Sequence, residues 1–258
     1  MVERLAGEDE IVRWLRAAAA HPGGVAVLTG AGMSAESGIP TFRDAMSGLW
    51  SRLDPAELAS EEGFRANPAH VWRWYAERRE GVRRAQPNAG HLALGEFARR
   101  HPGVLTVVTQ NVDDLHQRAG NTDAIRLHGD ILEDRWLEPC PRGRACAITE
   151  AVGAEPPRCG ECGKLVRPGV VWFGEMLPPG VMEAAEVAVR RCRVLLVVGT
   201  SGAVWPAAGL AGRARRAGAR VVIVNPHASE IDGEAHAVLR GTAAGVLPRL
   251  LASSPGSD

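Results

Sequence analysis

Four short apolar runs place the tightest limits on the fold of this 258-residue chain. They occupy residues 25–28, 104–109, 194–198 and 221–224, and each is followed at once by small or polar residues. Strands that are apolar along their whole length are typical of parallel sheets, because helices cover both faces of such a sheet. With 45% hydrophobic residues, the chain has enough apolar material for a large buried core.

Segments with helical spacing separate the apolar runs. Asn67 and Pro68 have the residue types of an N-cap and a first helical position, so we expect a helix from there to about Arg84. Further helices are expected before Pro22 and over residues 91–100, 180–191, 206–217 and 243–251. Strand character is also expected at 125–127 and 170–175, whereas 133–167 lacks periodicity. The alternation predicts an α/β fold with a doubly wound parallel sheet.

A glycine-rich loop follows the first apolar run. Gly30, Gly32 and Ala35 have the spacing of a dinucleotide-binding fingerprint. Gly30 permits a tight turn, Gly32 lets a pyrophosphate approach the backbone, and the amides of the next helix can meet the anion. Glycine-rich turns between a strand and a helix are common, so the loop alone leaves nucleotide binding open. Arg43, close behind it, suggests a second anion contact.

Polar residues follow the other predicted strands. Gln110, Asn111, Val112 and Asp113 follow the second run, and His128 follows the short strand at 125–127. Open α/β sheets bind ligands outside the carboxyl ends of their strands. A neutral imidazole near pH 7 suits general-base work on a hydroxyl group. The alternatives are a structural role for His128 and helix capping by Asn111 or Asp113.

The cysteines indicate a metal site. Cys140, Cys146, Cys159 and Cys162 are clustered, and Cys192 stands apart. In a reducing compartment, clustered cysteines favour a metal over disulfides, and four thiolates suit one closed, structural zinc. The alternative is a loop of free thiols, which would invite oxidation. We expect Cys192 to be a buried packing thiol.

The formal net charge is zero, so no overall field attracts nucleic acid or an anionic membrane. The first residues are acidic and polar and lack a signal-peptide core, and the sequence has no apolar run of about 18 residues. We therefore expect a cytoplasmic protein without nucleic-acid or membrane partners. Nothing in the sequence demands more than a monomer.

In combination and in order, these motifs resemble those of sirtuins. The motifs are Gly30-Ala31-Gly32-x-Ser34, Gly38-Ile39-Pro40-x-Phe42-Arg43, Thr109-Gln110-Asn111-Val112-Asp113, His128-Gly129, the four clustered cysteines, Phe173-Gly174-Glu175 and Gly199-Thr200-Ser201. The resemblance, to the bacterial type, covers about residues 25–248. It implies one catalytic unit over 1–258 with a Rossmann-like parallel sheet and a small inserted zinc-binding module. The implied large domain covers about 1–40, 90–132 and 168–252, and the small domain combines a helical insert at 41–89 with the zinc module at 133–167.

The resemblance also implies an activity, that of an NAD-dependent protein lysine deacylase acting on acylated lysine side chains of proteins. NAD would be consumed, giving nicotinamide, O-acyl-ADP-ribose and deacylated lysine. The implied catalytic residues are His128 as general base, Asn111 and Asp113. The implied NAD-binding residues are Gly30, Ala31, Gly32, Ser34, Ala35, Phe42, Arg43, Trp50, Gln110, Asn111, Val112, Asp113, Gly199, Thr200, Ser201, Asn225 and Ala243. The substrate would pair as a strand beside Val171, Trp172, Phe173, Gly174 and Glu175.

A finer resemblance concerns Tyr75 and Arg78. Residues three apart share one helix face, and a guanidinium beside a phenol suits a carboxylate. In the class III branch of sirtuins, a Tyr-x-x-Arg at this place recognises succinyl- or malonyl-lysine, and Ala35 and Thr41 also resemble that branch. This implies desuccinylase and demalonylase activity with deacetylase activity retained. The alternative is a solvated basic helix face.

Three departures from the sirtuin pattern leave substrate preference and zinc affinity open: Gly169, Trp205 and the wide spacing of Cys140 and Cys146. Two other functions compete. An NAD-dependent dehydrogenase with a structural zinc is weakened because Asp54, the acidic residue after the glycine loop, does not follow an apparent strand. A non-enzymatic zinc-ribbon module leaves the polar clusters at the strand ends unexplained.

Overall fold

The computed structural model describes residues 6–40, 55–141 and 155–252. Their contacts divide the chain into two compact units. The larger unit comprises Met1–Thr41, Ala85–Leu127 and Pro178–Asp258, and the smaller comprises Phe42–Arg84 and His128–Leu177. Within the described residues, no helix has both the length and the hydrophobicity that crossing a bilayer requires.

The larger unit is built on a parallel sheet of six strands in the order β3-β2-β1-β6-β7-β8. The strands are β1 (Val25–Thr29), β2 (Leu105–Thr109), β3 (Ile125–Arg126), β6 (Val194–Val198), β7 (Arg220–Val224) and β8 (Ala237–Leu239). The predicted parallel sheet is therefore confirmed. Strand β8 was not predicted from the sequence, because its three residues are too few to show a pattern.

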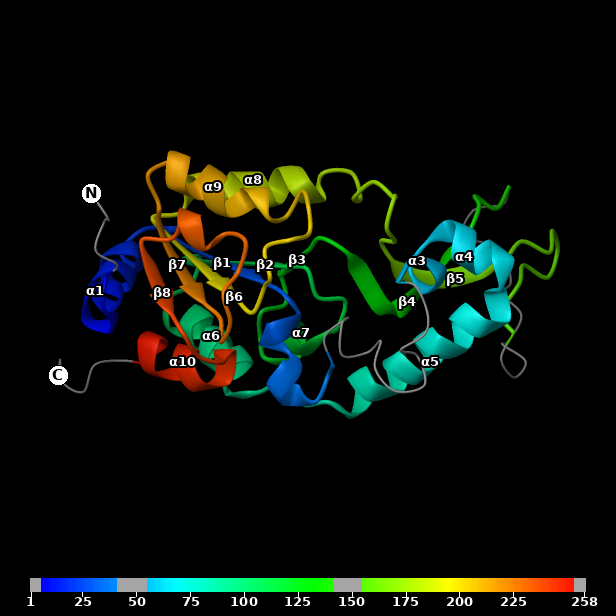
Figure 1. Ribbon diagram of the computed structural model, residues 1–258, viewed down its shortest axis with the longest axis horizontal. Coiled ribbons are helices and arrows are strands. Elements are labelled where there is room, and N and C mark those ends of the chain that lie inside the picture. Colours follow the sequence, from blue (N-terminus) through cyan, green and yellow to red (C-terminus); the bar gives the residue numbers. More distant parts are fainter. Residues whose placement is uncertain (1–5, 41–54, 142–154, 253–258) are drawn as a thin grey trace. The chain divides into compact units, whose positions relative to one another are not determined.

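Helices cover both faces of this sheet (Figure 1). One face carries α1 (Glu8–Ala19), α6 (Ala89–Arg100) and α10 (Ala243–Leu251), and the other carries α8 (Val181–Arg191) and α9 (Gly209–Arg216). A short helix, α7 (Leu115–Arg118), follows β2. The sheet is thus doubly wound, as the alternation of strands and helices predicts.

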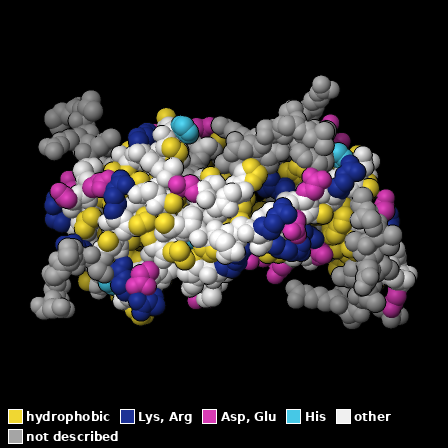
Figure 2. Space-filling model, turned by 90° about the horizontal axis from the view of Figure 1, so that it is seen from below, with side chains coloured by type: hydrophobic (Ala, Val, Ile, Leu, Met, Phe, Trp, Pro, Cys, Tyr) yellow, Lys and Arg dark blue, Asp and Glu magenta, His cyan; other side chains and the backbone are white. Residues whose placement is uncertain are grey.

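Charged side chains of both signs are interspersed on the surface drawn in Figure 2. Several form ion pairs within the larger unit, such as Arg99 with Glu96 and Arg249 with Glu8, each at 2.7 Å. Exposed pairs of this kind contribute little to stability. They agree with a chain whose formal net charge is zero.

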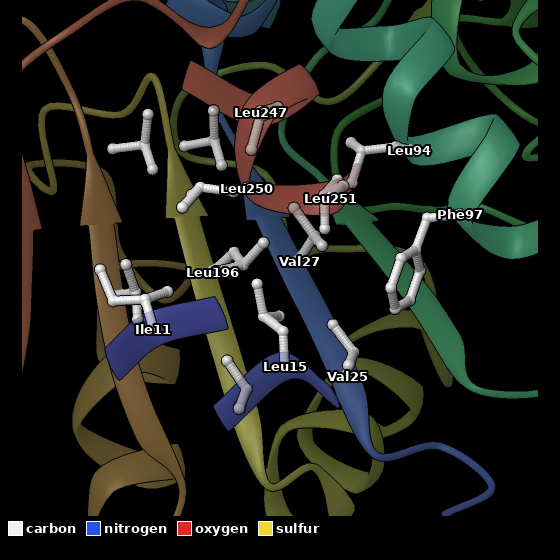
Figure 3. Close-up of a cluster of buried hydrophobic side chains, with 14 of the residues drawn as sticks. Ile11, Leu15, Val25, Val27, Leu94, Phe97, Leu196, Leu247, Leu250 and Leu251 are labelled. Atoms are coloured by element: carbon white, nitrogen blue, oxygen red, sulfur yellow. The ribbon is translucent and has the colours of Figure 1, made fainter. Parts of the chain in front are cut away.

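The core of the larger unit lies on both faces of β1 because successive side chains of a strand point in opposite directions. Val25 and Val27 pack with Ile11 and Leu15 of α1, as Figure 3 shows. Ala26 and Leu28 belong to the second core cluster, which includes residues of α8 and α9. The burial of every β1 side chain explains its uninterrupted apolar sequence.

The loops after β1 and β6 meet at the carboxyl edge of the sheet. The Gly32 N–H donates to the Gly199 carbonyl at 2.8 Å, and a Cβ on Gly32 would lie 2.8 Å from the Gly199 Cα. Gly199 itself has a φ of 62°, and a Cβ there would lie 2.4 Å from the Met33 nitrogen. Only glycines fit this close approach. It occurs at the switch point of the strand order, where open α/β sheets bind ligands.

The prediction of a helix directly after the glycine loop is wrong. Two 3₁₀ turns, Ala31–Met33 and Ala35–Ser37, take its place. Gly38 then has a φ of 82°, a left-handed conformation that ends the second turn. The buried Ser34 side chain between the turns is held by residues that follow β2, which fixes the local path of the chain.

The smaller unit contains an antiparallel pair, β4 (Gly129–Trp136) and β5 (Val166–Val170), with helices α3 (Pro55–Leu58), α4 (Glu61–Ala66) and α5 (Pro68–Arg84). Helix α5 begins at Pro68 and ends at Arg84, as the sequence predicts. The strand expected over 170–175 is corrected: β5 ends at Val170, and the Glu175 N–H turns back to the Trp172 carbonyl at 3.1 Å.

The boundary between the units differs from the expected domain ranges. Residues 128–132 and 168–177, expected in the large domain, fall in the smaller unit, and residues 85–89, expected in the small domain, fall in the larger one. The first difference arises because β4 and β5 pair with each other instead of joining the parallel sheet. The domain ranges themselves stay a prediction.

Candidate functional site

Ser34 joins the glycine loop to the loop after β2. Its hydroxyl donates to Asp113 Oδ2 at 2.9 Å and accepts from Asn111 Nδ2 at 3.0 Å. All three side chains are buried. Three predicted site residues, far apart in the sequence, therefore form one hydrogen-bonded group at the carboxyl edge of the sheet.

The Asp113 carboxylate is fixed from several sides. Its Oδ1 accepts from the N–H of Leu115, the first residue of α7, at 3.0 Å. Arg126 donates to the carbonyls of Val112 and Asp113, each at 3.0 Å. Burial raises the pKa of Asp113, while the hydrogen bonds from Leu115 and Ser34 act in the opposite direction. A polar group of a bound ligand would therefore meet the Asp113 carboxylate as an oriented, poorly solvated acceptor.

Two threonines and a histidine lie behind this group. Thr109 Oγ1 accepts from the Asn111 N–H at 3.0 Å and from the Thr29 hydroxyl at 2.8 Å. His116 Nε2 lies 3.0 Å from Thr29 Oγ1. Burial lowers the pKa of His116 to about 3, so this ring is neutral at pH 7. The threonines at the ends of β1 and β2 thus hold the backbone of Asn111.

The loops after β6 and β7 carry the remaining predicted cofactor residues. Gln110 Nε2 donates to Thr200 Oγ1 at 3.2 Å, and Asn225 Nδ2 lies 3.4 Å from the Thr200 carbonyl. Ser201 is exposed, and Ala243 is the first residue of α10. In the larger unit the structure therefore describes Gly30, Ala31, Gly32, Ser34, Ala35, Gln110, Asn111, Val112, Asp113, Gly199, Thr200, Ser201, Asn225 and Ala243. Phe42, Arg43 and Trp50 lie outside the described residues.

Two residues that sequence reasoning missed secure the glycine loop. Asn88 Nδ2 donates to the Met33 carbonyl at 2.9 Å and to Ser37 Oγ at 3.0 Å, while its Oδ1 caps α6. Glu36 accepts from the Ala244 N–H at 2.9 Å, at the start of α10. The sequence signal at Asn88 is the asparagine itself ahead of a helical segment, which indicates a helix N-cap and not a contact to a distant loop.

His128 lies in the smaller unit, in the turn before β4. Its carbonyl accepts from the Val171 N–H at 2.9 Å, so its backbone is tied to the segment predicted to bind substrate. Farther along that segment, the Phe173 N–H donates to the Ala59 carbonyl at 2.8 Å, and the Phe173 side chain is 54% exposed. Gly129 and Gly169 permit the approach of β4 and β5, since a Cβ on Gly129 would lie 2.2 Å from the Gly169 carbonyl oxygen.

Tyr75 and Arg78 lie together on α5. Tyr75 is 4% exposed, and its hydroxyl oxygen accepts from Trp172 Nε1 at 2.9 Å. Burial raises the pKa of Tyr75 to about 12, and the nearby charge of Arg78 partly opposes this. Arg78 is half-buried, with its guanidinium 4.6 Å from the centroid of the Trp74 ring. Arg78 is thus less exposed than Arg83. The exposed Arg83 fits the alternative of a solvated basic helix face.

Three of the four predicted zinc ligands converge in the smaller unit. The Cys140 sulfur lies 3.9 Å from that of Cys159 and 3.7 Å from that of Cys162. Thiolates about 2.3 Å from a tetrahedral zinc are about 3.8 Å apart, so the three sulfurs fit this ion. The Cys162 N–H also points to the Cys159 sulfur at 3.4 Å. Cys146 lies outside the described residues.

Cys192 is separate from this group. It lies in the larger unit in the core against α8 and α9, 4% exposed, and burial raises the pKa of its thiol to about 12. It is a packing residue, as expected. Within the described residues, Cys140, Cys159 and Cys162 form the one group of three or more side chains suited to a metal.

A doubly wound parallel sheet with a glycine loop at its switch point defines the chain as a nucleotide-binding type of α/β protein, here with a cysteine group suited to a metal in a second unit. The family model of the Sir2 family matches residues 30–206, and the chain belongs to that family. The predicted resemblance to sirtuins is thereby confirmed.

Named relatives agree with this assignment. An NAD-dependent protein deacylase of Ralstonia nicotianae is 52% identical over 228 residues, which are 88% of this chain and 91% of that protein. A solved Sir2 homolog–NAD complex is 41% identical with a TM-score of 0.83, covering 97% of this chain and 95% of the other. Sir2Tm bound to a propionylated peptide is 27% identical with a TM-score of 0.75, covering 93% of this chain and 97% of the other.

Proposed function

We propose that this chain is an NAD-dependent protein lysine deacylase. The observation that carries the proposal is the buried group of Ser34, Asn111 and Asp113 beside the glycine loop. Such a group offers oriented donors and acceptors to a bound nucleotide. The proposal is supported by family membership, by the relatives named as deacylases, and by the NAD and propionylated peptide in solved relatives.

The residues of the larger unit fit NAD. Gly30 and Gly32 leave a bare backbone that a pyrophosphate could approach, and glycine is required at both positions because Cβ atoms there would collide with Gly199 and Thr200. Asn111 and Asp113 would bind the nicotinamide-ribose half, together with Ser34 and Gln110. The residues that would bind the adenosine half are Gly199, Thr200, Ser201, Asn225 and Ala243. Further contacts to NAD would come from Phe42, Arg43 and Trp50. NAD supplies a labile bond between nicotinamide and ribose.

His128 and the segment Val171–Glu175 would serve the acyl-lysine. The segment would bind the peptide as an added strand, and His128 would remove a proton from a ribose hydroxyl. The products would be nicotinamide, free lysine and O-acyl-ADP-ribose. The cysteine centre contains no open ligand position in this proposal, so its zinc would be structural and take no part in the reaction.

The test is mass spectrometry of an acetyl-lysine peptide incubated with the protein and NAD. We expect loss of the acetyl group with release of equal amounts of nicotinamide and O-acetyl-ADP-ribose. The competing dehydrogenase would instead produce reduced nicotinamide, which is detected by its absorbance. If no nicotinamide is released from NAD and acylated peptide, the deacylase proposal is wrong.

We further propose that the enzyme removes succinyl and malonyl groups. Support comes from Tyr75 and Arg78, which place a protonated phenol and a half-buried cation side by side on α5. A guanidinium and a hydroxyl together suit the free carboxylate of these acyl groups. An acetyl group lacks that carboxylate and would make no use of either residue.

Arg78→Met tests this specificity. Loss of a charge-assisted hydrogen bond is expected to raise KM for a succinyl peptide by about tenfold or more, with a much smaller effect on an acetyl peptide. Steady-state kinetics on the two peptides measures the difference. Arg83→Met, on the exposed face of the same helix, is the matched control. Equal effects of Arg78→Met on both peptides would remove the carboxylate role.

A further inference from the structure

The indole of Trp172 is held rigidly in the smaller unit. Its side chain is 2% exposed, and its backbone N–H donates to Glu175 Oε2 at 2.8 Å. The Arg167 guanidinium lies 3.2 Å from the ring centroid, and the Phe64 ring lies 5.3 Å away. An aromatic ring packed in this way has no room to turn, so the direction of its N–H is fixed.

The buried Arg167 side chain is itself fixed by an ion pair and a backbone hydrogen bond. It forms an ion pair with Glu175 and donates to the Val170 carbonyl at 2.7 Å. Its side chain is 2% exposed. Glu175 also pairs with Arg135 at 2.6 Å. The position of Trp172 therefore depends on a buried cation that the sequence motifs did not reveal.

The fixed indole N–H determines how Tyr75 can bond. An indole nitrogen only donates, so in the 2.9 Å contact the Tyr75 oxygen must be the acceptor. The phenol proton has to seek a different acceptor. Among the described residues the Tyr75 hydroxyl donates no hydrogen bond of its own, and Arg78, whose charge acts on Tyr75, only donates.

We propose that Trp172 is a specificity-determining positioning residue that acts through Tyr75. By occupying the phenol oxygen, Trp172 turns the phenol proton towards an anionic acceptor, the terminal carboxylate of an acidic acyl chain on lysine. Accepting one hydrogen bond also strengthens the bond that the phenol donates. The inference rests on the proposed succinyl and malonyl activity, and it adds Trp172 to the residues that decide it.

A double-mutant cycle tests the inference. The wild type, Trp172→Phe, Tyr75→Phe and the double variant are compared by kcat/KM on succinyl and acetyl peptides. We expect the succinyl-to-acetyl ratio to fall about tenfold in each single variant, the size of one hydrogen bond to a charged acceptor. The double variant should fall no further, because both changes remove the same interaction.

Two outcomes overturn the inference. One is a Trp172→Phe effect on the ratio that is equally large in the Tyr75→Phe background, which would show that Trp172 does not act through the phenol. The other is an unchanged ratio in Trp172→Phe. If that variant does not fold, benzothienylalanine at position 172 replaces the indole N–H by sulfur at nearly the same size. An unchanged succinyl-to-acetyl ratio of kcat/KM in this variant would then overturn the inference.

The cycle also separates this inference from the proposed function. If the wild type removes acetyl but not succinyl groups, the proposed acidic-acyl activity fails, and the inference fails with it. If the wild type removes succinyl groups and Arg78→Met lowers the ratio while Trp172→Phe does not, only the inference on Trp172 is wrong.

Discussion

At the scale of single residues, polar side chains gain their roles from partners far away in the sequence. Ser34 is an ordinary loop serine until Asn111 and Asp113 contact its hydroxyl. Likewise Tyr75 is an aromatic residue on a helix until Trp172 donates to it. The chemical character of such residues follows from burial and from the direction of each hydrogen bond. Residue-level predictions therefore concern single side-chain atoms.

His128→Ala belongs to this scale. Since the imidazole is the proposed proton acceptor, we expect the variant to fold, to bind NAD and to lose turnover by about two to four orders of magnitude. Calorimetric titration with NAD and nicotinamide release measure the two properties separately. His21→Ala, an exposed histidine after α1, is the control. Full activity of His128→Ala would refute the assignment as general base.

At the scale of elements, the strands β4 and β5 hold the cysteine centre. Cys140 follows β4, and Cys159 and Cys162 precede β5, so a bound zinc would connect the two strands where they diverge. Metal binding at such a site is coupled to folding, because the unfolded chain does not preform the ligand set. The fold of this segment and its metal content should therefore change together.

Cys159→Ser tests that coupling. We expect bound zinc to fall from about one ion per chain to none, with a lower melting temperature, because a hydroxyl is a poor substitute for a thiolate ligand. Metal analysis by mass spectrometry and thermal unfolding provide the readouts. Cys192→Ala, in the core of the larger unit, should retain the zinc. Retention of a full zinc ion by Cys159→Ser would contradict the ligand set.

At the scale of the whole molecule, two buried histidines connect stability to pH. His91 on α6 and His116 on α7 have ring centroids 4.9 Å apart. Burial lowers the pKa of His91 to about 4 and that of His116 to about 3. An unfolded histidine has a pKa of about 6.5, so the unfolded chain binds protons first as the pH falls. The contribution of these two histidines to the free energy of unfolding is fully present above about pH 6.5 and declines as the pH falls below it.

His91→Phe tests this dependence. Each histidine should lower the free energy of unfolding by about 1.4 kcal/mol per pH unit between about pH 6.5 and its folded pKa. Between about pH 4 and 6.5 the slope of the variant should be smaller than that of the wild type by about 1.4 kcal/mol per pH unit, measured by urea unfolding at stepped pH. Its stability at pH 7 should change little, since neither ring nitrogen of His91 has a hydrogen-bond partner among the described residues. An unchanged slope would contradict the assignment, and the exposed His21→Phe is the control.

Several features could be predicted because their physical causes are local. The uninterrupted apolar runs require burial on both sides, and Pro68 and Ala243 begin helices at the bounds that the sequence indicated. The cytoplasmic location, the monomeric state and the absence of nucleic-acid and membrane partners stay predictions from composition. The residue roles at the nucleotide and substrate segments also stay predictions, which the variants above address.

The sequence by itself determined the parallel α/β fold and the glycine loop, because burial, turn chemistry and helix capping act between neighbours along the chain. Only the tertiary structure decided that 3₁₀ turns follow the loop, that Asn88 and Glu36 secure it, and that Trp172 bonds to Tyr75. Those features depend on which distant residues meet. A hydrogen bond between positions about 100 residues apart has no signature in either local segment.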